Sequence, residues 1–216
     1  MMLGDTAHTG TYSGPVTRAI AISAGSTHTY SITRDEEVVC WGQNAYGQAA
    51  PPQGTFFSVS AGEYHSCGVQ TDGSARCWGI TDGSSSDMGQ VSNTPSGNYT
   101  TISAGSLHSC ALTTNGDPEC WGGDIYGQAT PPTSSFVSIS AGSLHTCGLT
   151  TSNEIECWGE NSFGQATPPT GTFQSVSTGA FHTCAIDSGG SLTCWGWGDF
   201  GQTLAPSEAS VMVSGG

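Results

Sequence analysis

Short stretches of alternating apolar and polar residues recur along the chain, with the period of strands rather than of helices. In one unit, residues 136–140 read Phe-Val-Ser-Ile-Ser. Two further stretches, 145–151 and 154–159, are rich in β-forming residues and are bounded by Ser, Asn and Gly. A proline-marked connector, Gly-Gln-Ala-Thr-Pro-Pro-Thr, then leads to the next unit. Each unit therefore predicts several short strands joined by turns.

Four sequence markers recur once in each unit: the first three step by 37, 43, 37 and 37 residues, and the fourth by 42, 38, 37 and 37. The first is a Ser-x-Gly triplet, which begins at Ser23, Ser60, Ser103, Ser140 and Ser177. The second is a histidine (His28, His65, His108, His145 and His182), and the third is a tryptophan (Trp41, Trp78, Trp121, Trp158 and Trp195). The fourth is a Gly-Gln pair, which begins at Gly47, Gly89, Gly127, Gly164 and Gly201. Units of about 40 residues with several strands and a Trp-Gly signature are typical of propeller blades. We therefore predict an all-β propeller of about five blades over residues 16–202. The second unit is longer, and its loop at residues 80–92 should protrude.

Eight of the nine cysteines form pairs ten residues apart: Cys67/Cys77, Cys110/Cys120, Cys147/Cys157 and Cys184/Cys194. The midpoint of each pair falls in a turn, and a three-residue turn needs a positive φ at its last residue, which suits Gly73, Gly116, Asn153 and Gly190. This register places the two cysteines opposite each other with Cα atoms about 4.5 Å apart, within the range of a disulfide. We predict hairpin disulfides in four blades, the alternative being reduced cysteines packed as small apolar residues. In the first unit Tyr30 faces Cys40, which is left unpaired.

Residues 136–169 resemble repeats of the regulator-of-chromosome-condensation type. The resemblance is closest to the bacterial, cysteine-containing form, which includes the propeller-type β-lactamase inhibitory protein. The shared motif is Ser-Ala-Gly-x-x-His-Thr-Cys, then Cys-Trp-Gly and Gly-Gln. The resemblance implies a propeller scaffold that uses its loops and faces for contacts with other proteins. Familiar members usually carry seven blades, whereas this chain has five hairpin units.

Charge excludes several classes of partner. The chain has no lysine, three arginines and 17 acidic residues, for a net charge of −14. Such a surface repels nucleic acid and anionic membranes, and no apolar run is long enough to span a membrane. Few charges and many Ser and Thr residues favour an oxidising compartment. Residues 1–14 do not follow the pattern of a secretory signal, which predicts either a trimmed chain or export by another route, such as packaging into a virus particle.

The two ends of the chain are expected to lie outside the ring of blades. Residues 1–15 form an N-terminal arm. Residues 203–216 contain a sixth copy of the first strand, because Ser214 falls 37 residues after Ser177. We expect this strand to complete a blade or to pair with a neighbouring chain.

Function should lie where the units differ. The residues that precede the histidines vary, and we predict a partner-binding face made by them, by Trp197 and by the 80–92 loop with Met88: Tyr64, Leu107, Leu144, Phe181, Trp197 and Met88. The alternative is that these side chains are buried under the loops. The aromatic rings before Gly-Gln (Tyr46, Tyr126, Phe163 and Phe200) and the five repeated tryptophans indicate packing between blades. The histidines are expected to bond backbone groups of their own blade, with a ring of metal ligands as the alternative.

The sequence has no nucleophile elbow, phosphate loop or His-Glu-x-x-His motif, so we predict a non-catalytic protein without cofactor. The first hypothesis is a structural or adhesion component at the cell exterior or virion surface, as a homo-oligomer or docked on a larger particle. The second is a secreted binder or inhibitor of another protein. The third is an enzyme with a carboxylate or metal site on the propeller axis.

Overall fold

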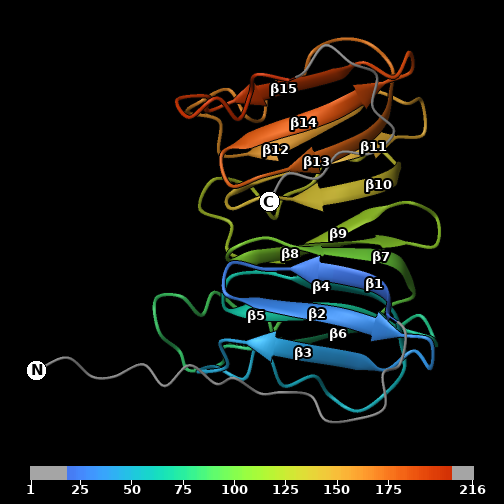
Figure 1. Cartoon of the computed structure of the whole chain (residues 1–216), viewed down its shortest axis with the longest axis vertical. Coiled ribbons are helices and arrows are strands. Elements are labelled where there is room, and N and C mark those ends of the chain that lie inside the picture. Colours follow the sequence, from blue (N-terminus) through green and yellow to red (C-terminus); the bar gives the residue numbers. More distant parts are fainter. Residues whose placement is uncertain (1–18, 206–216) are drawn as a thin grey trace, which may run out of the picture.

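A computed structural model describes residues 19–205 as fifteen strands in five antiparallel three-stranded sheets. Each sheet is one repeat, and its strands pair in chain order (Figure 1). The strands are β1 (Ala19–Ala24), β2 (His28–Thr33), β3 (Val38–Gly42), β4 (Phe56–Ala61), β5 (His65–Gln70), β6 (Ala75–Gly79), β7 (Tyr99–Ala104), β8 (His108–Thr113), β9 (Pro118–Gly122), β10 (Phe136–Ala141), β11 (His145–Thr150), β12 (Ile155–Gly159), β13 (Phe173–Thr178), β14 (His182–Asp187) and β15 (Leu192–Gly196). The predicted propeller blades are confirmed.

The four predicted hairpin disulfides are present, with Cα atoms 4.0 to 4.1 Å apart. Each joins the middle strand of a blade to its third strand: Cys67–Cys77, Cys110–Cys120, Cys147–Cys157 and Cys184–Cys194. The cysteine on the middle strand is buried in every pair, whereas its partner on the third strand is only half-buried, namely Cys77, Cys120, Cys157 and Cys194. The alternative, reduced cysteines packed as small apolar residues, is therefore wrong for all four pairs.

The turns between the paired cysteines have the predicted conformation. The angle φ is positive at Gly73 (88°) and at Asn153 (65°), as at the two equivalent glycines. In the first blade Tyr30 lies opposite Cys40, as predicted, and Cys40 is a free thiol. Burial raises the pKa of the Cys40 thiol to about 12.

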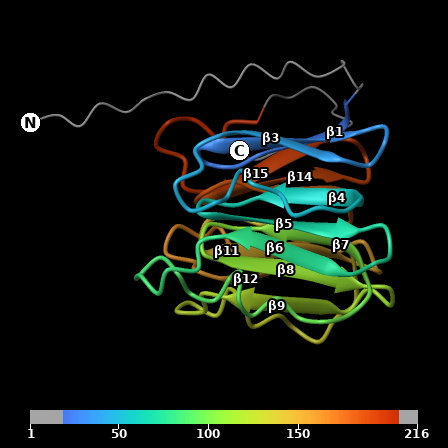
Figure 2. The same ribbon diagram turned by 90° about the horizontal axis from the view of Figure 1, so that it is seen from below.

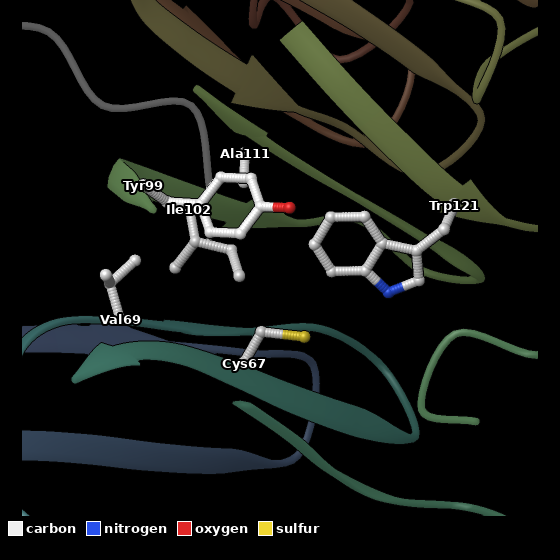
Figure 3. Close-up of a cluster of buried hydrophobic side chains, with 6 residues drawn as sticks. All are labelled: Cys67, Val69, Tyr99, Ile102, Ala111 and Trp121. Atoms are coloured by element: carbon white, nitrogen blue, oxygen red, sulfur yellow. The ribbon is translucent and has the colours of Figure 1, made fainter. Parts of the chain in front are cut away.

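The core lies between successive blades rather than within any one of them. Side chains from the far side of one sheet pack against the near side of the next, as Figure 3 shows for the second and third blades. The cluster there consists of Cys67, Val69, Tyr99, Ile102, Ala111 and Trp121, each at most 6% exposed. Similar clusters join the first blade to the second and the fourth to the fifth. One type of interface, repeated along the chain, therefore holds the blades together.

Within residues 19–205 the five blades form an open arc. Each sheet packs on the next along the chain, but no packing of that extent joins the fifth sheet to the first. In Figure 1 the first blade (blue) lies in the lower half of the view and the fifth (orange and red) at the top. Among the described residues, no sheet covers the outer apolar face of the first blade. Ile22 is 72% and Trp41 47% exposed, whereas the equivalent Ile102 and Trp121 are 4% and 6% exposed.

The second-unit insertion projects from the arc, as predicted, since residues 81–85 are all exposed. It is the blue-green loop on the left in Figures 1 and 2. The predicted N-terminal arm (1–15) and residues 206–216 of the predicted C-terminal strand lie outside the described residues. Nowhere between residues 19 and 205 is there a helix of the length and apolarity needed to cross a membrane.

Candidate protein-interaction face

Two loops of every blade meet on one rim of the arc. One loop precedes the repeated histidine, and the other follows the repeated Trp-Gly. A backbone hydrogen bond ties them together in each blade: Gln43 N to Thr27 O, Ile80 N to Tyr64 O, Gly123 N to Leu107 O, Glu160 N to Leu144 O and Trp197 N to Phe181 O, all between 2.7 and 3.0 Å. We call the surface made by these ten loops the loop face. It contains every residue of the predicted partner-binding set.

The predicted disulfide cysteines do not belong to the loop face. All eight lie inside strands, where they form pairs across the hairpins. The half-buried members on the third strands, such as Cys77, Cys120 and Cys194, are bonded to a buried partner and carry no free thiol. These cysteines therefore hold the blades that carry the loops and are not contact residues themselves.

The Gly-Gln pair fixes the second loop. The buried glutamine side chain accepts a hydrogen bond from the backbone N–H two residues earlier, as from Phe163 N to Gln165 Oε1 at 3.0 Å. Gly164, between them, has a φ of 80°, which favours glycine even though a Cβ there would meet no atom within 4 Å. The same bond occurs in all five blades. The side chain before each Gly-Gln pair is thereby held at the surface.

The rings before Gly-Gln are exposed, which sequence reasoning missed. Their exposed fractions are 38% for Tyr46, 53% for Tyr126, 50% for Phe163 and 82% for Phe200. We predicted packing between blades for them, and two do touch the next blade: Tyr46 contacts Tyr64, and Phe163 contacts Phe181. Because each keeps a large open surface, they add to the loop face rather than to the core.

The fourth and fifth blades together build an aromatic quartet from Phe163, Phe181, Trp197 and Phe200. Ring centroids are 6.0 Å apart for Phe163 with Phe181 and with Trp197, 6.1 Å for Phe181 with Trp197, and 5.1 Å for Trp197 with Phe200. Most of these contacts are edge-to-face, a favourable geometry for aromatic pairs. Phe181 and Trp197 were predicted for partner binding, and the structure brings them together.

The other predicted residues lie elsewhere on the loop face and are partly buried. Tyr64 lies against Tyr46, with ring centroids 5.6 Å apart. Met88 and Leu107 lie side by side over Gly123, where an added Cβ would be 3.6 Å and 3.3 Å from their Cβ atoms. Leu144 precedes His145 at the equivalent place in the fourth blade, and its carbonyl accepts the hydrogen bond from Glu160 N. A role in partner binding stays a prediction for all of these residues.

Four of the five repeated histidines bond the next blade, so for these four the prediction that they bond backbone groups of their own blade is wrong. His145 Nε2 lies 2.9 Å from Thr183 Oγ1, and that hydroxyl donates to the Gln165 carbonyl at 3.0 Å. The imidazole must therefore be the donor at Nε2, which leaves Nδ1 without a proton. The same pairing joins His28, His65 and His108 to Ser66, Ser109 and Thr146. Strand alternation explains the error, since it turns these side chains out of their own sheet.

Burial keeps these imidazoles neutral. It lowers the pKa of His65 to about 3, and the pKa values of His108 and His145 to about 4. Within residues 19–205, no group of three or more His, Cys, Asp or Glu side chains is placed to hold a metal ion. The buried histidines therefore link neighbouring blades through hydrogen bonds.

The tryptophans confirm the predicted packing role in four blades. The indole Nε1–H of Trp121 donates to the Gln90 carbonyl of the preceding blade at 3.0 Å, and Trp158 and Trp195 make the equivalent bonds. In the second blade the acceptor is instead the Tyr30 hydroxyl, at 2.9 Å from Trp78 Nε1. Trp41 is the exception, because no blade within residues 19–205 packs in front of it.

A cavity of about 310 Å³ lies on the axis, where the five first strands converge. Ser, Ala, Gly and Thr line it, together with Glu63. Among the described residues, its wall therefore presents one carboxylate, that of Glu63.

This is the architecture of a β-propeller repeat protein. The blades repeat, similar hydrogen bonds link neighbouring blades, and the loops gather on one rim. The family pattern described as "Regulator of chromosome condensation (RCC1) repeat" matches residues 19–48, 58–90, 99–128, 136–165 and 173–202. The chain belongs to this family, as the resemblance of its repeats implied. No curated protein sequence matches the chain.

Several solved structures are similar. The CRINKLY WD40 ectodomain of the Arabidopsis thaliana receptor kinase ACR4 is 26% identical, with a TM-score of 0.75 over 94% of this chain and 74% of that one. The ectodomain of the Physcomitrella patens receptor kinase CR4 is 28% identical, with a TM-score of 0.73 over 87% of this chain and 53% of that one. Prp20p of Saccharomyces cerevisiae, at 16% identity and a TM-score of 0.72 over 89% of this chain and 62% of that one, shares the fold.

Proposed function

We propose that this chain is a non-catalytic protein-binding module that acts outside the cytoplasm and presents its loop face to the partner. The aromatic quartet is the observation that carries the proposal. Aromatic side chains are the favoured anchors of protein interfaces. The Gly-Gln turns hold the quartet's exposed rings in place before any partner arrives, which reduces the entropy lost on binding.

Location outside the cytoplasm is supported by the four disulfides, which are typical of oxidising compartments. The two receptor-kinase structures at 26% and 28% identity are also ectodomains. The finer proposal is a structural or adhesion component on a cell exterior or virus particle. The alternative is a soluble secreted binder or inhibitor. Light scattering separates them, because an assembly component should self-associate or dock on a larger body, whereas a soluble binder should remain monomeric.

Absence of catalysis is part of the proposal. RCC1-like propellers are typically non-catalytic, and the axial cavity offers a single carboxylate among the described residues. A panel of hydrolase substrates tests this point, with turnover by the purified chain as the contrary result.

Selection from a phage-displayed peptide library tests the binding face. We expect the immobilised chain to enrich peptides that no longer bind when Trp197→Ala and Phe200→Ala are combined. The matched control is Phe57→Ala, which removes an exposed ring (44%) from β4, away from the loop face. Two results would count against the proposal: peptides that bind the Trp197→Ala/Phe200→Ala variant as well as they bind the Phe57→Ala control, or no enrichment at all.

A further inference from the structure

Positive charge is missing from the described part of the loop face. The two arginines within residues 19–205 lie elsewhere: Arg34 in the turn between β2 and β3 on the opposite rim, and Arg76 near the start of β6. The loops of the loop face contain six acidic residues, namely Glu63, Asp82, Asp87, Asp124, Glu160 and Asp199. This face is therefore complementary in charge to a basic partner.

Glu160 is the unusual member of that set because it is buried. Its side chain is 8% exposed, and Oε1 accepts a hydrogen bond from Ser162 N at 2.8 Å. Its Oε2 is buried and has no hydrogen-bond partner. A buried carboxylate oxygen without a donor is costly. The carboxylate therefore has an unused acceptor at the base of the turn that carries Phe163.

The aromatic quartet supplies the second half of a cation site. Phe163 of that turn contacts Phe181 and Trp197, and Trp197 contacts Phe200. An indole face is the most favourable aromatic surface for a cation. Asp199, which is exposed, directly precedes Phe200 in the sequence and is a second acidic residue in this part of the loop face. Arginine fits such a site better than lysine, since its planar guanidinium stacks on rings and donates in a fork to carboxylates.

We infer that the aromatic quartet, with Glu160 and Asp199, receives an arginine side chain from a basic segment of the protein partner. This inference rests on the proposed function, because it names the chemistry that the loop face recognises. The rings contribute stacking area, while the two carboxylates provide the charge selectivity.

Titration of the uniformly ¹⁵N-labelled chain with short peptides tests the inference. The probe is acetyl-Gly-Arg-Gly-Arg-Gly-amide, and the control is the same peptide with citrulline, which has the shape of arginine without its charge. Six tryptophans give six indole signals, and Trp197→Phe identifies the signal of Trp197. We expect the arginine peptide to shift that signal saturably, the citrulline peptide to bind at least tenfold more weakly, and 0.5 M salt to weaken arginine binding.

Single variants locate the charge. Glu160→Gln keeps an oxygen for Ser162 N and should weaken binding of the arginine peptide about tenfold, and Asp199→Asn should weaken it less. Glu154→Gln, in the turn between β11 and β12 on the opposite rim, is the matched control and should leave binding unchanged. Equal binding of citrulline, or an affinity indifferent to both Glu160→Gln and Asp199→Asn, overturns the inference. If the library yields uncharged peptides that still need Trp197 and Phe200, the proposed function stands and this inference alone fails.

Discussion

Lowering the pH from 7 to 5 should strongly destabilise this propeller, because its blades are joined by neutral histidines. His65, His108 and His145 are each completely buried and bond a hydroxyl of the next blade. Burial lowers their pKa values from 6.5 to about 3, 4 and 4. In the unfolded chain the same side chains bind a proton near pH 6.5.

The direction of the change in stability with pH follows from proton binding to the folded and unfolded chains. Below pH 6.5 the unfolded chain takes up protons that the folded chain refuses, so the free energy of unfolding falls as the pH falls. The stability that these histidines provide by staying neutral is complete above pH 6.5 and is lost as the pH falls toward 4. At pH 5 each of the three histidines costs about 2 kcal/mol, or about 5–6 kcal/mol in total. A loss of that size rivals the whole stability of a typical domain, about 5–15 kcal/mol.

Urea unfolding followed by tryptophan fluorescence at pH 7, 6 and 5 measures the loss, with ionic strength constant and the disulfides intact. His65→Gln is the matched variant, because an amide N–H can still donate to Ser109 but cannot titrate in this range. It should reduce the loss between pH 7 and 5 by about 2 kcal/mol. A free energy of unfolding that changes by less than about 1 kcal/mol between pH 7 and 5 would refute the reasoning.

Three further predictions use differences between blades. Trp121→Phe removes the bond to the Gln90 carbonyl and leaves a cavity, so chemical denaturation should show a loss of about 2 kcal/mol, whereas Trp41→Phe at the bare end should change stability by less than about 0.5 kcal/mol. Replacing Cys147 and Cys157 together by alanine should lower the free energy of unfolding by about 2–3 kcal/mol, and a parent chain whose stability is unchanged by reductant would contradict this. Gly164→Ala should cost about 1 kcal/mol in urea unfolding from its positive φ, with no change in the packing of the core, because the added methyl meets open space.

The blades and their disulfides could be predicted because the evidence for them is local. The ten-residue spacing of Cys147 and Cys157 and the Asn153 turn lie within one hairpin, and the conformation that the turn requires fixes which residues face each other. Contacts between blades depend on how whole sheets stack, which no single hairpin reveals. His145 and Thr183 illustrate this, since the hydroxyl lies in the next repeat.

The sequence nevertheless contains a signal for the hydrogen bonds between blades. Every repeated histidine is followed directly by Ser or Thr, as in His145-Thr146, so each blade carries both a donor and the hydroxyl that the preceding blade needs. The exposed aromatic rings had no such signal. Trp158 and Phe163 are both repeated aromatic residues in one unit, and only the Gln165 side chain, which braces the turn, decides that Phe163 stays at the surface.

The open arc has a consequence for how the protein loses its structure. In a chain of nearest-neighbour modules, a module flanked on both sides is held by two couplings and a terminal one by a single coupling. Amide protons of β2 should therefore exchange with deuterated water sooner than those of β8, although each strand is the middle strand of its own three-stranded sheet. Opening would then begin at the first and fifth blades, which each have one neighbour within residues 19–205, and would proceed inward blade by blade.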